Sequence, residues 1–332
     1  VFIDGEPMQR GEDQDYVINY NTAEITFTPK RMITKDSRIQ VEFGYADRNY
    51  LNSQLYAMDE VKINNKLKLK LAAYNNADAR NSPVNQTLDP KQRQFLADIG
   101  DSTQNAYYPS ASIDTFSASK ILYRKIDTLV NGVLLDSIYV YSTNASDTLY
   151  SLAFSDVGVG KGDYLTDESN AANCKIFRWV APDSNNNKQW QYEPKILLIA
   201  PRKQQLISLG AEYALSANST ISTELAMSNF DVNTFSSRNK SDNTGFAARL
   251  LLNNTRQIKN SSKGLQFQTN LGYEWVQSAF KPIERLRAVE FNREWGLPLN
   301  AGPATENILK AGVQLRDRTG FNLQYQLSSY VR

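Results

Sequence analysis

Charged side chains are dense between residues 279 and 304, and this stretch offers groups that could perform acid–base chemistry. Three glutamates there could supply the carboxylate pair of a glycosidase: Glu284, Glu290 and Glu294. Three arginines interleave with them: Arg285, Arg287 and Arg293. Because nothing else positions the carboxylates, a salt-bridged rim is the simpler interpretation. The chain also lacks His, the commonest general base and metal ligand. We therefore expect a non-catalytic protein.

Two other stretches resemble ligand loops. Acidic residues 12–15 could form a calcium loop, but the Gly and the distant Glu of an EF-hand are missing, which favours a solvated turn. Residues 158–163 are rich in Gly, yet they lack the spacing of a phosphate loop and no helical pattern follows them. Cys174 is alone, so neither a disulfide nor a thiolate zinc site can form within the chain. We expect no cofactor and no metal.

Composition restricts the class of protein. A hydrophobic content of 41% and the absence of any run of about 18 apolar residues exclude a bundle of membrane helices. This composition criterion does not exclude a transmembrane β-barrel, because only every second residue of a barrel strand must be apolar. The net charge of +2 gives no field strong enough to indicate a nucleic-acid partner. The 18 Tyr residues favour strands over helices.

The clearest structural pattern lies within residues 264–277, where apolar and polar side chains alternate from Leu265 to Trp275. Odd positions are apolar and end in a Tyr-Trp pair, whereas even positions are polar with little charge. The alternation lasts about eleven residues, compared with roughly five or six in an ordinary strand. A lipid-facing strand of a transmembrane barrel has this length and this character.

Similar alternation recurs from residue 204 to residue 331 and predicts six strands in an up-and-down meander, joined alternately by short turns and longer connections. We predict that eight side chains face lipid: Leu265, Phe267, Leu271, Tyr273, Trp275, Leu323, Tyr325 and Leu327. We predict that six side chains face a wet lumen: Gln266, Gln268, Asn270, Glu274, Glu224 and Arg249. A soluble antiparallel sheet packed on one side also alternates, and that alternative stays open.

The chain divides into four predicted parts, mainly all-β. Residues 1–46 form a small β-sandwich-like module with turns at Asp4-Gly5 and at residues 21–22 and a last strand over residues 38–46, and residues 47–78 form the first barrel strands. Residues 79–195 form a folded insertion with a short helix near 90–99, capped by Asp89 and followed by Gly100, and a hairpin at Asn131-Gly132. Residues 196–332 supply the remaining barrel strands, and we interpret both ends of the sequence as cut.

Two groups of residues carry a resemblance. Residues 1–6, 10–20, 25–28 and 37–43 resemble a β module of large Bacteroidota cell-envelope proteins, although Asn19 and Ala23 replace the usual Asp and Gly. Residues 226–236 and 287–295 are similar to barrel segments of large, mostly uncharacterised outer-membrane proteins of that phylum, with a distant resemblance to the type IX secretion translocon barrel. The resemblance implies a Gram-negative outer membrane and carries over no catalytic residues.

The sequence thus predicts a segment of a large outer-membrane β-barrel, with a periplasmic β module before it, that serves transport, secretion or envelope assembly. Its expected partners are outer-membrane lipid, the remainder of its own barrel and envelope proteins, but not nucleic acid. The competing hypothesis is a soluble cell-surface or periplasmic β protein that binds a glycan or a protein partner. Its binding platform would use exposed aromatic side chains: Trp179, Trp190 and Tyr192.

Overall fold

The computed structural model describes most of the chain, in two compact units that are treated separately below. The described residues are 1–11, 14–19, 24–30, 33–34, 36–42, 49–84, 86–117, 120–167, 176–258, 264–298 and 301–332. Unit 1 comprises Val1–Gln86, Pro201–Val232 and Asn239–Arg332. Unit 2 comprises Thr87–Ala200 and Asn233–Arg238.

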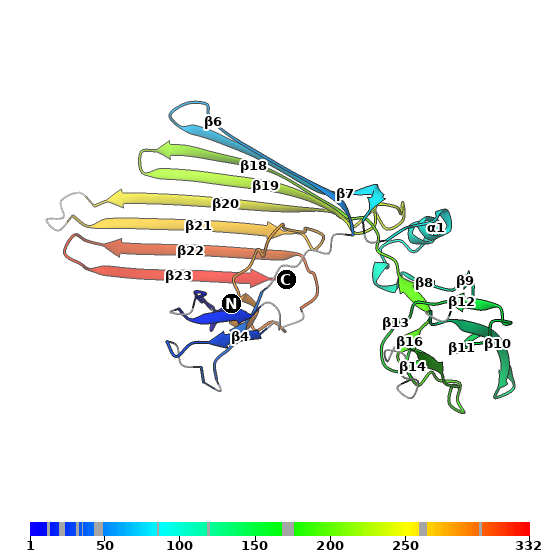
Figure 1. Cartoon of the computed structure of the whole chain (residues 1–332). Coiled ribbons are helices and arrows are strands. Elements are labelled where there is room, and N and C mark those ends of the chain that lie inside the picture. The colour runs from blue at the N-terminus through cyan, green and yellow to red at the C-terminus, as the bar shows by residue number, and fades with distance from the viewer. Residues whose placement is uncertain are drawn as a thin grey trace. The chain divides into compact units, whose positions relative to one another are not determined.

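Unit 1 is built on one eight-stranded antiparallel sheet in the order β23-β22-β21-β20-β19-β18-β7-β6 (Figure 1). Its strands are β6 (Tyr50–Lys62), β7 (Leu67–Pro83), β18 (Lys203–Ser216), β19 (Ser219–Asp231), β20 (Thr244–Gln257), β21 (Gln266–Val276), β22 (Glu306–Arg316) and β23 (Asn322–Val331). The six strands predicted after residue 204 are therefore confirmed, and they pair with their sequence neighbours. In the part of the chain that the structure describes, β6 and β23 each pair on one side, so the sheet is open.

The register places the apolar positions of neighbouring strands on the same face of the sheet. Leu250 of β20 pairs with Thr223 of β19 and Tyr273 of β21, and Tyr273 pairs with Leu309 of β22. Directly paired residues of antiparallel strands point to the same side of a sheet. One face therefore collects the apolar positions of the strands and the other face collects the polar positions.

The two ends of the sheet carry different connections. Four short connections lie at one end: 63–66, 217–218, 258–265 and 317–321. Three long connections lie at the other end: 84–202, which contains most of unit 2, 232–243 and 277–305. The chain also enters β6 at this second end, because Tyr50 pairs with Pro83. The predicted alternation of short and long connections is confirmed.

The N-terminal module of unit 1 consists of two small sheets. β1 (Phe2–Ile3) pairs with β2 (Glu6–Pro7) and β5 (Ile39–Gln40), and β3 (Tyr16–Asn19) pairs with β4 (Glu24–Phe27). The predicted Asp4-Gly5 turn is confirmed, with positive φ at both residues. Of the strand predicted over residues 38–46, residues 39–40 form β5 and residues 41–42 are not in a strand, whereas residues 43–46 lie outside the described residues. The turn predicted at residues 21–22 lies outside the described residues.

Unit 2 combines three small antiparallel sheets with a helix. Their orders are β11-β10-β12-β9, β13-β16-β14-β15 and β17-β8. The bounds are β8 (Tyr107–Pro109), β9 (Ser112–Asp114), β10 (Tyr123–Val130), β11 (Val133–Tyr141), β12 (Leu149–Ser151), β13 (Ser155–Asp156), β14 (Tyr164–Thr166), β15 (Phe177–Trp179), β16 (Tyr192–Glu193), β17 (Lys195–Leu197), α1 (Pro90–Asp98) and the 3₁₀ turn η1 (Thr103–Asn105). The hairpin at Asn131-Gly132 is confirmed as the turn between β10 and β11.

Helix α1 begins and ends at the predicted signals. The Asp89 side chain accepts a hydrogen bond from the Gln92 backbone N–H at 2.8 Å, and the Gln92 side chain accepts one from the Asp89 N–H. This capping box satisfies two backbone donors that a helix start leaves free. Gly100 follows the helix with a φ of 62°, a conformation that favours glycine.

The prediction of a mainly all-β, antiparallel chain is confirmed. Apart from α1 and η1, the described helical structure is α2 (Phe291–Glu294), within the connection between β21 and β22. Among the described residues, no helix has the length and apolar character that crossing a membrane would require.

Candidate functional site

The apolar face of the eight-stranded sheet is largely exposed. Its large side chains are solvent-accessible along most of the strands, and Leu225 and Tyr325 are 55% and 67% exposed. Other exposed members of this face are Leu71, Ile207, Leu209, Met227, Phe246, Leu250, Leu271, Tyr273, Leu309, Val313, Leu323, Leu327 and Val331. Soluble monomers rarely expose an apolar patch that continues over so many neighbouring strands.

The side chains predicted to face lipid fall on this apolar face with one exception. Seven of them share it through direct pairing: Phe267, Leu271, Tyr273, Trp275, Leu323, Tyr325 and Leu327. Leu265 lies just before β21, which starts at Gln266 rather than at residue 264. The Leu265 carbonyl accepts a hydrogen bond from the Ile258 N–H at 2.9 Å, one step beyond the Gln257–Gln266 pair.

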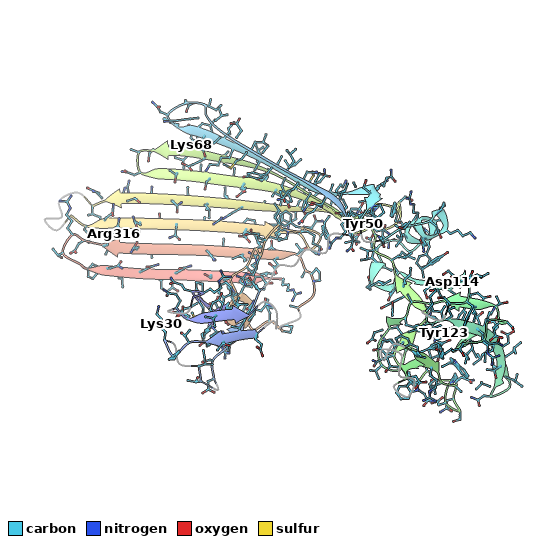
Figure 2. All side chains as sticks on the ribbon, viewed as in Figure 1. Lys30, Tyr50, Lys68, Asp114, Tyr123 and Arg316 are labelled. Carbon is cyan, nitrogen blue, oxygen red and sulfur yellow. The ribbon has the colours of Figure 1, made fainter. Side chains whose placement is uncertain are left out.

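The opposite face, termed here the polar face, carries rows of alternating charge. One row runs through Glu60, Lys70, Glu224, Arg249 and Glu274 on successive strands, with Gly210 between the second and third. Lys70 pairs with Glu60 at 3.2 Å. The neighbouring row contains Lys68 and Glu212, 4.0 Å apart. Lys68 and Arg316, labelled in Figure 2, both belong to this face.

The structure brings together the side chains predicted to face a lumen. All six lie on the polar face: Gln266, Gln268, Asn270, Glu274, Glu224 and Arg249. Arg249 is paired in register between Glu224 and Glu274. Among the described residues it makes no salt bridge, and its side chain is exposed.

Residues 277–298, termed here the strap, fold back over the polar face near the end with the long connections (orange in Figure 1). The Lys281 backbone N–H donates to the Ser228 hydroxyl of β19 at 2.9 Å, and the Gln204 side-chain amide of β18 donates to the Pro282 carbonyl at 3.2 Å. Ser228 is fully buried beneath this contact. At Gly245 of β20, a Cβ atom would overlap the Phe280 backbone, so the close approach requires glycine.

Arg287 ties the strap to two further strands of the sheet. Its guanidinium forms an ion pair with Glu274 of β21, and its Nη2 atom lies 2.6 Å from Glu306 of β22. The three side chains are only about one fifth exposed, at 18%, 25% and 21%. A guanidinium that donates to two carboxylates at once fixes its orientation, and partial burial strengthens the pairs over those at an open surface.

The strap also contacts the end of β23 and the N-terminal module. Its helix α2 packs Phe291 edge-on against Tyr330, with ring centroids 5.3 Å apart, and Trp295 lies 5.4 Å from the same ring. Arg285 forms an ion pair with Glu42, and its guanidinium stands 5.1 Å from the centre of the Phe2 ring. The strap is therefore held on one side by the sheet and on the other by the N-terminal module.

Two neighbouring hollows lie on the polar face. One of about 440 Å³ has Lys70, Glu212 and Glu224 in its wall. The other, of about 520 Å³, lies between the sheet and the strap and is walled by Glu274, Lys310 and Trp295 among others. Arg249 and Leu251 line both, so Arg249 stands where the two hollows meet.

An aromatic core holds unit 2 together. Phe154 stacks on Phe177 with ring centroids 4.2 Å apart, and Tyr123 (labelled in Figure 2), Tyr164 and Tyr192 surround this pair. Burial raises the pKa of Tyr123, against a weaker lowering by a hydrogen bond from the Phe177 N–H. Burial likewise raises the pKa of Tyr164. Both hydroxyls accept backbone hydrogen bonds and act structurally.

Two of the three aromatic side chains proposed as a binding platform line one hollow. Tyr192 packs edge-on against the core ring of Phe177 at 5.0 Å and also lines this open hollow of about 630 Å³. Trp190, which is 41% exposed, lines it as well, together with Arg178 and Asp167. Trp179 does not line this hollow.

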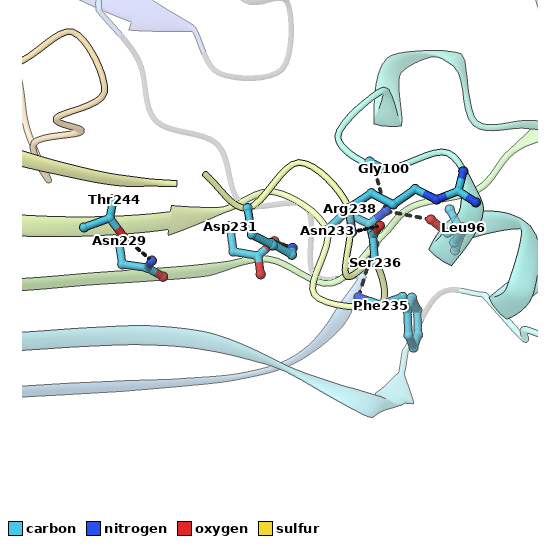
Figure 3. Close-up of polar contacts among 10 residues, drawn as sticks. Leu96, Gly100, Asn229, Asp231, Asn233, Phe235, Ser236, Arg238 and Thr244 are labelled. Carbon is cyan, nitrogen blue, oxygen red and sulfur yellow. Dashed lines mark hydrogen bonds and ion pairs between the residues drawn. The ribbon is translucent and has the colours of Figure 1, made fainter. Parts of the chain in front are cut away.

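Asn233 anchors the short segment of unit 2 that follows β19, Asn233–Arg238, to the end of α1. Its buried side-chain amide donates to the Leu96 carbonyl at 2.7 Å and to the Gly100 carbonyl at 2.6 Å (Figure 3). These carbonyls lie at the C-terminal end of α1, where carbonyls lack partners within the helix. Arg238 donates to the Asp98 carbonyl at the same helix end, at 2.6 Å.

The three arginines that interleave with the candidate catalytic glutamates form ion pairs with different partners. Arg293 pairs with Glu290, the residue before α2, at 2.9 Å, whereas Arg285 and Arg287 pair with glutamates outside the strap. The pairs of Arg285 and Arg287 fasten the strap, and the pair of Arg293 lies within it. Of the acidic stretch, residues 12 and 13 lie outside the described residues, as does Cys174. Within the described ranges, no group of three His, Cys, Asp or Glu side chains could hold a metal.

Sequence reasoning missed the strap. The charges and Pro282 and Pro298 showed that the strand pattern is broken between β21 and β22. Nothing in the pattern indicates which face the connection covers, because its contacts use backbone atoms and residues from six strands. The glycine at position 245, within an otherwise regular strand, was the one local signal of a close approach.

Residues 1–47 match the model of a family described as a domain of unknown function (DUF8818). No curated protein and no solved structure matches the chain. The matched residues cover the N-terminal module and end before β6. What the sheet, the strap and unit 2 do must therefore be argued from their geometry.

Proposed function

We propose that the eight-stranded sheet is a segment of a large outer-membrane β-barrel, with its apolar face against lipid and its polar face toward a water-filled lumen. One observation carries the proposal: the strap covers the polar face and leaves the apolar face bare. A sheet that folds in water gains stability by covering its apolar face. In a soluble protein we would therefore expect a connection like the strap to cover the apolar face and leave the polar face exposed.

The dimensions of the strands support the same proposal. The eight strands are 10 to 17 residues long, at or above the roughly 9–11 residues that a tilted strand needs to cross a bilayer. Tyr273 and Trp275 stand near the long-connection end of β21 on the apolar face. Aromatic side chains at this level are typical of the interfacial girdles of transmembrane barrels.

The strap argues for more strands than the eight described. A barrel of about eight strands encloses a space that side chains alone fill. The strap places a folded segment with the helix α2 on the polar face, and this needs a wider interior. We therefore propose that β6 and β23 pair with further strands of the same barrel, because an open edge is not tolerated in lipid.

The arrangement of connections also bears on topology. In outer-membrane barrels the short turns are periplasmic and the longer loops extracellular. The chain enters β6 at the same end of the sheet as the long connections. In this proposal the N-terminal module therefore lies on the extracellular side with the long connections, rather than in the periplasm as we expected from sequence.

The proposed role is passage, secretion or envelope assembly across a Gram-negative outer membrane, without catalysis. Lipid and the remaining strands of the barrel are its first partners, and envelope proteins are further candidates. The polar face supports this role because it presents amides, hydroxyls and balanced charges rather than a field of one sign. Such a wall favours hydrated solutes and does not favour nucleic acid.

Fractionation of cells that express the full-length gene tests the proposal. We expect the protein to stay in the outer-membrane fraction after a carbonate wash and to leave it only with detergent. Protein released by carbonate would contradict the assignment and favour a soluble or peripheral β protein.

The competing function, glycan binding by a surface protein, is supported by one observation, the exposed Trp190 beside Arg178 and Asp167. An aromatic face flanked by a few polar groups is a common form of small-ligand site. This hypothesis predicts that a Trp190→Ala variant loses binding to immobilised surface glycans, with Trp179→Ala as the control. It leaves the bare apolar face of the sheet unexplained.

A further inference from the structure

We infer that the strap is a fixed constriction of the passage lined by the polar face, held in place by Arg287 and tuned in ion selectivity by Arg249. The inference rests on the proposed function, because a constriction requires that the polar face line a passage.

The strap reaches across a wide part of the wall. Its contacts involve Glu306, Glu274, Gly245, Ser228 and Gln204, one residue on each of the five successive strands from β22 to β18. A connection that only joined β21 to β22 would need to contact those two strands. The additional reach over β20, β19 and β18 places the strap across the space in front of the polar face.

The contacts hold the strap in one position. Where the strap meets the sheet, its Phe280 and the sheet residues Val276 and Ile308 are buried, at 9%, 8% and 5% exposure, and the two sheet residues belong to the polar face. Arg287 adds two ion pairs to this small apolar core. A loop that swings freely has few buried apolar contacts, which is the opposite of what is found here.

The polar face beside the strap presents both signs of charge. Glu224, Arg249 and Glu274 are directly paired neighbours, and Arg287 neutralises Glu274 from the strap side. Arg249 is exposed and lines both hollows, so a solute that moves from one hollow to the other passes its guanidinium. A ring of one charge gives a pore strong ion selectivity, whereas mixed charges give weak selectivity.

Single-channel recording of the full-length protein in planar bilayers tests the inference. We expect the Arg287→Ala variant to raise conductance about twofold or more, because conductance follows the open width of the narrowest segment. Arg293→Ala is the matched control: because Arg293 pairs with Glu290 within the strap, we expect this variant to leave the wild-type conductance unchanged. Glu306→Gln, which keeps size and removes one charge, replaces Arg287→Ala if that variant does not fold.

Selectivity gives an independent readout from the same recordings. Wild-type protein is expected to show a reversal potential near zero in a salt gradient, and Arg249→Glu is expected to shift it toward cation selectivity. Gln268→Glu, on the polar face of β21 but away from the strap, is expected to cause a smaller shift.

The outcomes separate the two levels of the proposal. Protein that fails to insert into membranes refutes the barrel assignment itself. If inserted wild-type protein is closed, opening by Arg287→Ala supports the constriction. Inserted protein whose conductance and reversal potential are unchanged in both arginine variants overturns the constriction and leaves the barrel standing.

Discussion

Replacing Leu250 by Arg puts a charge at the middle of the apolar face, since Leu250 lies near the centre of β20 (Thr244–Gln257) between Thr223 and Tyr273. If this face contacts lipid, the guanidinium sits near the bilayer midplane, and the expected loss is about 2–4 kcal/mol of the free energy of unfolding. If the face contacts water, the site is 40% exposed and a long side chain reaches solvent, so the expected loss is about 0.5 kcal/mol or less.

The neighbouring residue provides a control of the same type. Leu251 belongs to the same strand but to the polar face, where it lines the two hollows beside Arg249. Leu251→Arg places the same charge at nearly the same depth in a wet, polar setting, and the expected loss is about 1 kcal/mol from lost packing on Gly272. Reversible denaturant unfolding from phospholipid vesicles, followed by Trp fluorescence, measures both. Equal effects of the two substitutions would refute the assignment of the faces.

Three further predictions concern the strap and unit 2. Gly245→Ala is expected to displace the strap from the sheet and expose it to protease, because the new Cβ overlaps the Phe280 backbone. Gly210→Ala is the control, because its new Cβ would lie 3.5 Å from the nearest atom, the Cβ of Lys70, and digestion is expected to stay unchanged. Asn233→Ala is expected to cost unit 2 about 1–3 kcal/mol in denaturant unfolding, since two buried carbonyls lose their donor. A loss below about 0.5 kcal/mol, roughly a twofold change in the unfolding equilibrium constant, would contradict that role. Because the pKa of Tyr123 is raised in the folded state, its contribution to the stability of unit 2 is fully present below the ordinary tyrosine value near 10 and is lost as pH rises through the folded pKa. Absorbance at alkaline pH is therefore expected to show late tyrosinate formation coupled to loss of structure. Early titration of all tyrosines with the fold intact would contradict this prediction.

Much of the sheet could be predicted from the sequence because its information is local. Each strand alternates by itself, as residues 266–276 do, so the face of Phe267 or Glu274 follows from its own position in the strand. The ends of α1 were equally predictable, since Asp89 and Gly100 act on backbone groups only a few residues away. The exception, Leu265, lies one residue before the start of β21.

The strap could not be predicted because its position depends on atoms far apart in the chain. The Lys281 N–H finds Ser228, and Arg285 finds Glu42 in the N-terminal module. Neither contact leaves a periodic trace in the sequence. For the same reason charged residues 284–294 resembled possible catalytic groups, although Arg285 and Arg287 serve to fasten the strap.

Whether the apolar face of the sheet touches hydrocarbon is tested most directly by nitroxide spin labels placed one at a time from Gln266 to Val276, in a background with Cys174 replaced by Ser. Collision rates with oxygen, which concentrates in lipid, and with a water-soluble nickel complex are then compared along β21. We predict a period of two, with oxygen favoured at Phe267, Leu271 and Tyr273 and nickel favoured at Gln268 and Asn270. Equal access of the nickel complex to both sets of positions would contradict the central claim.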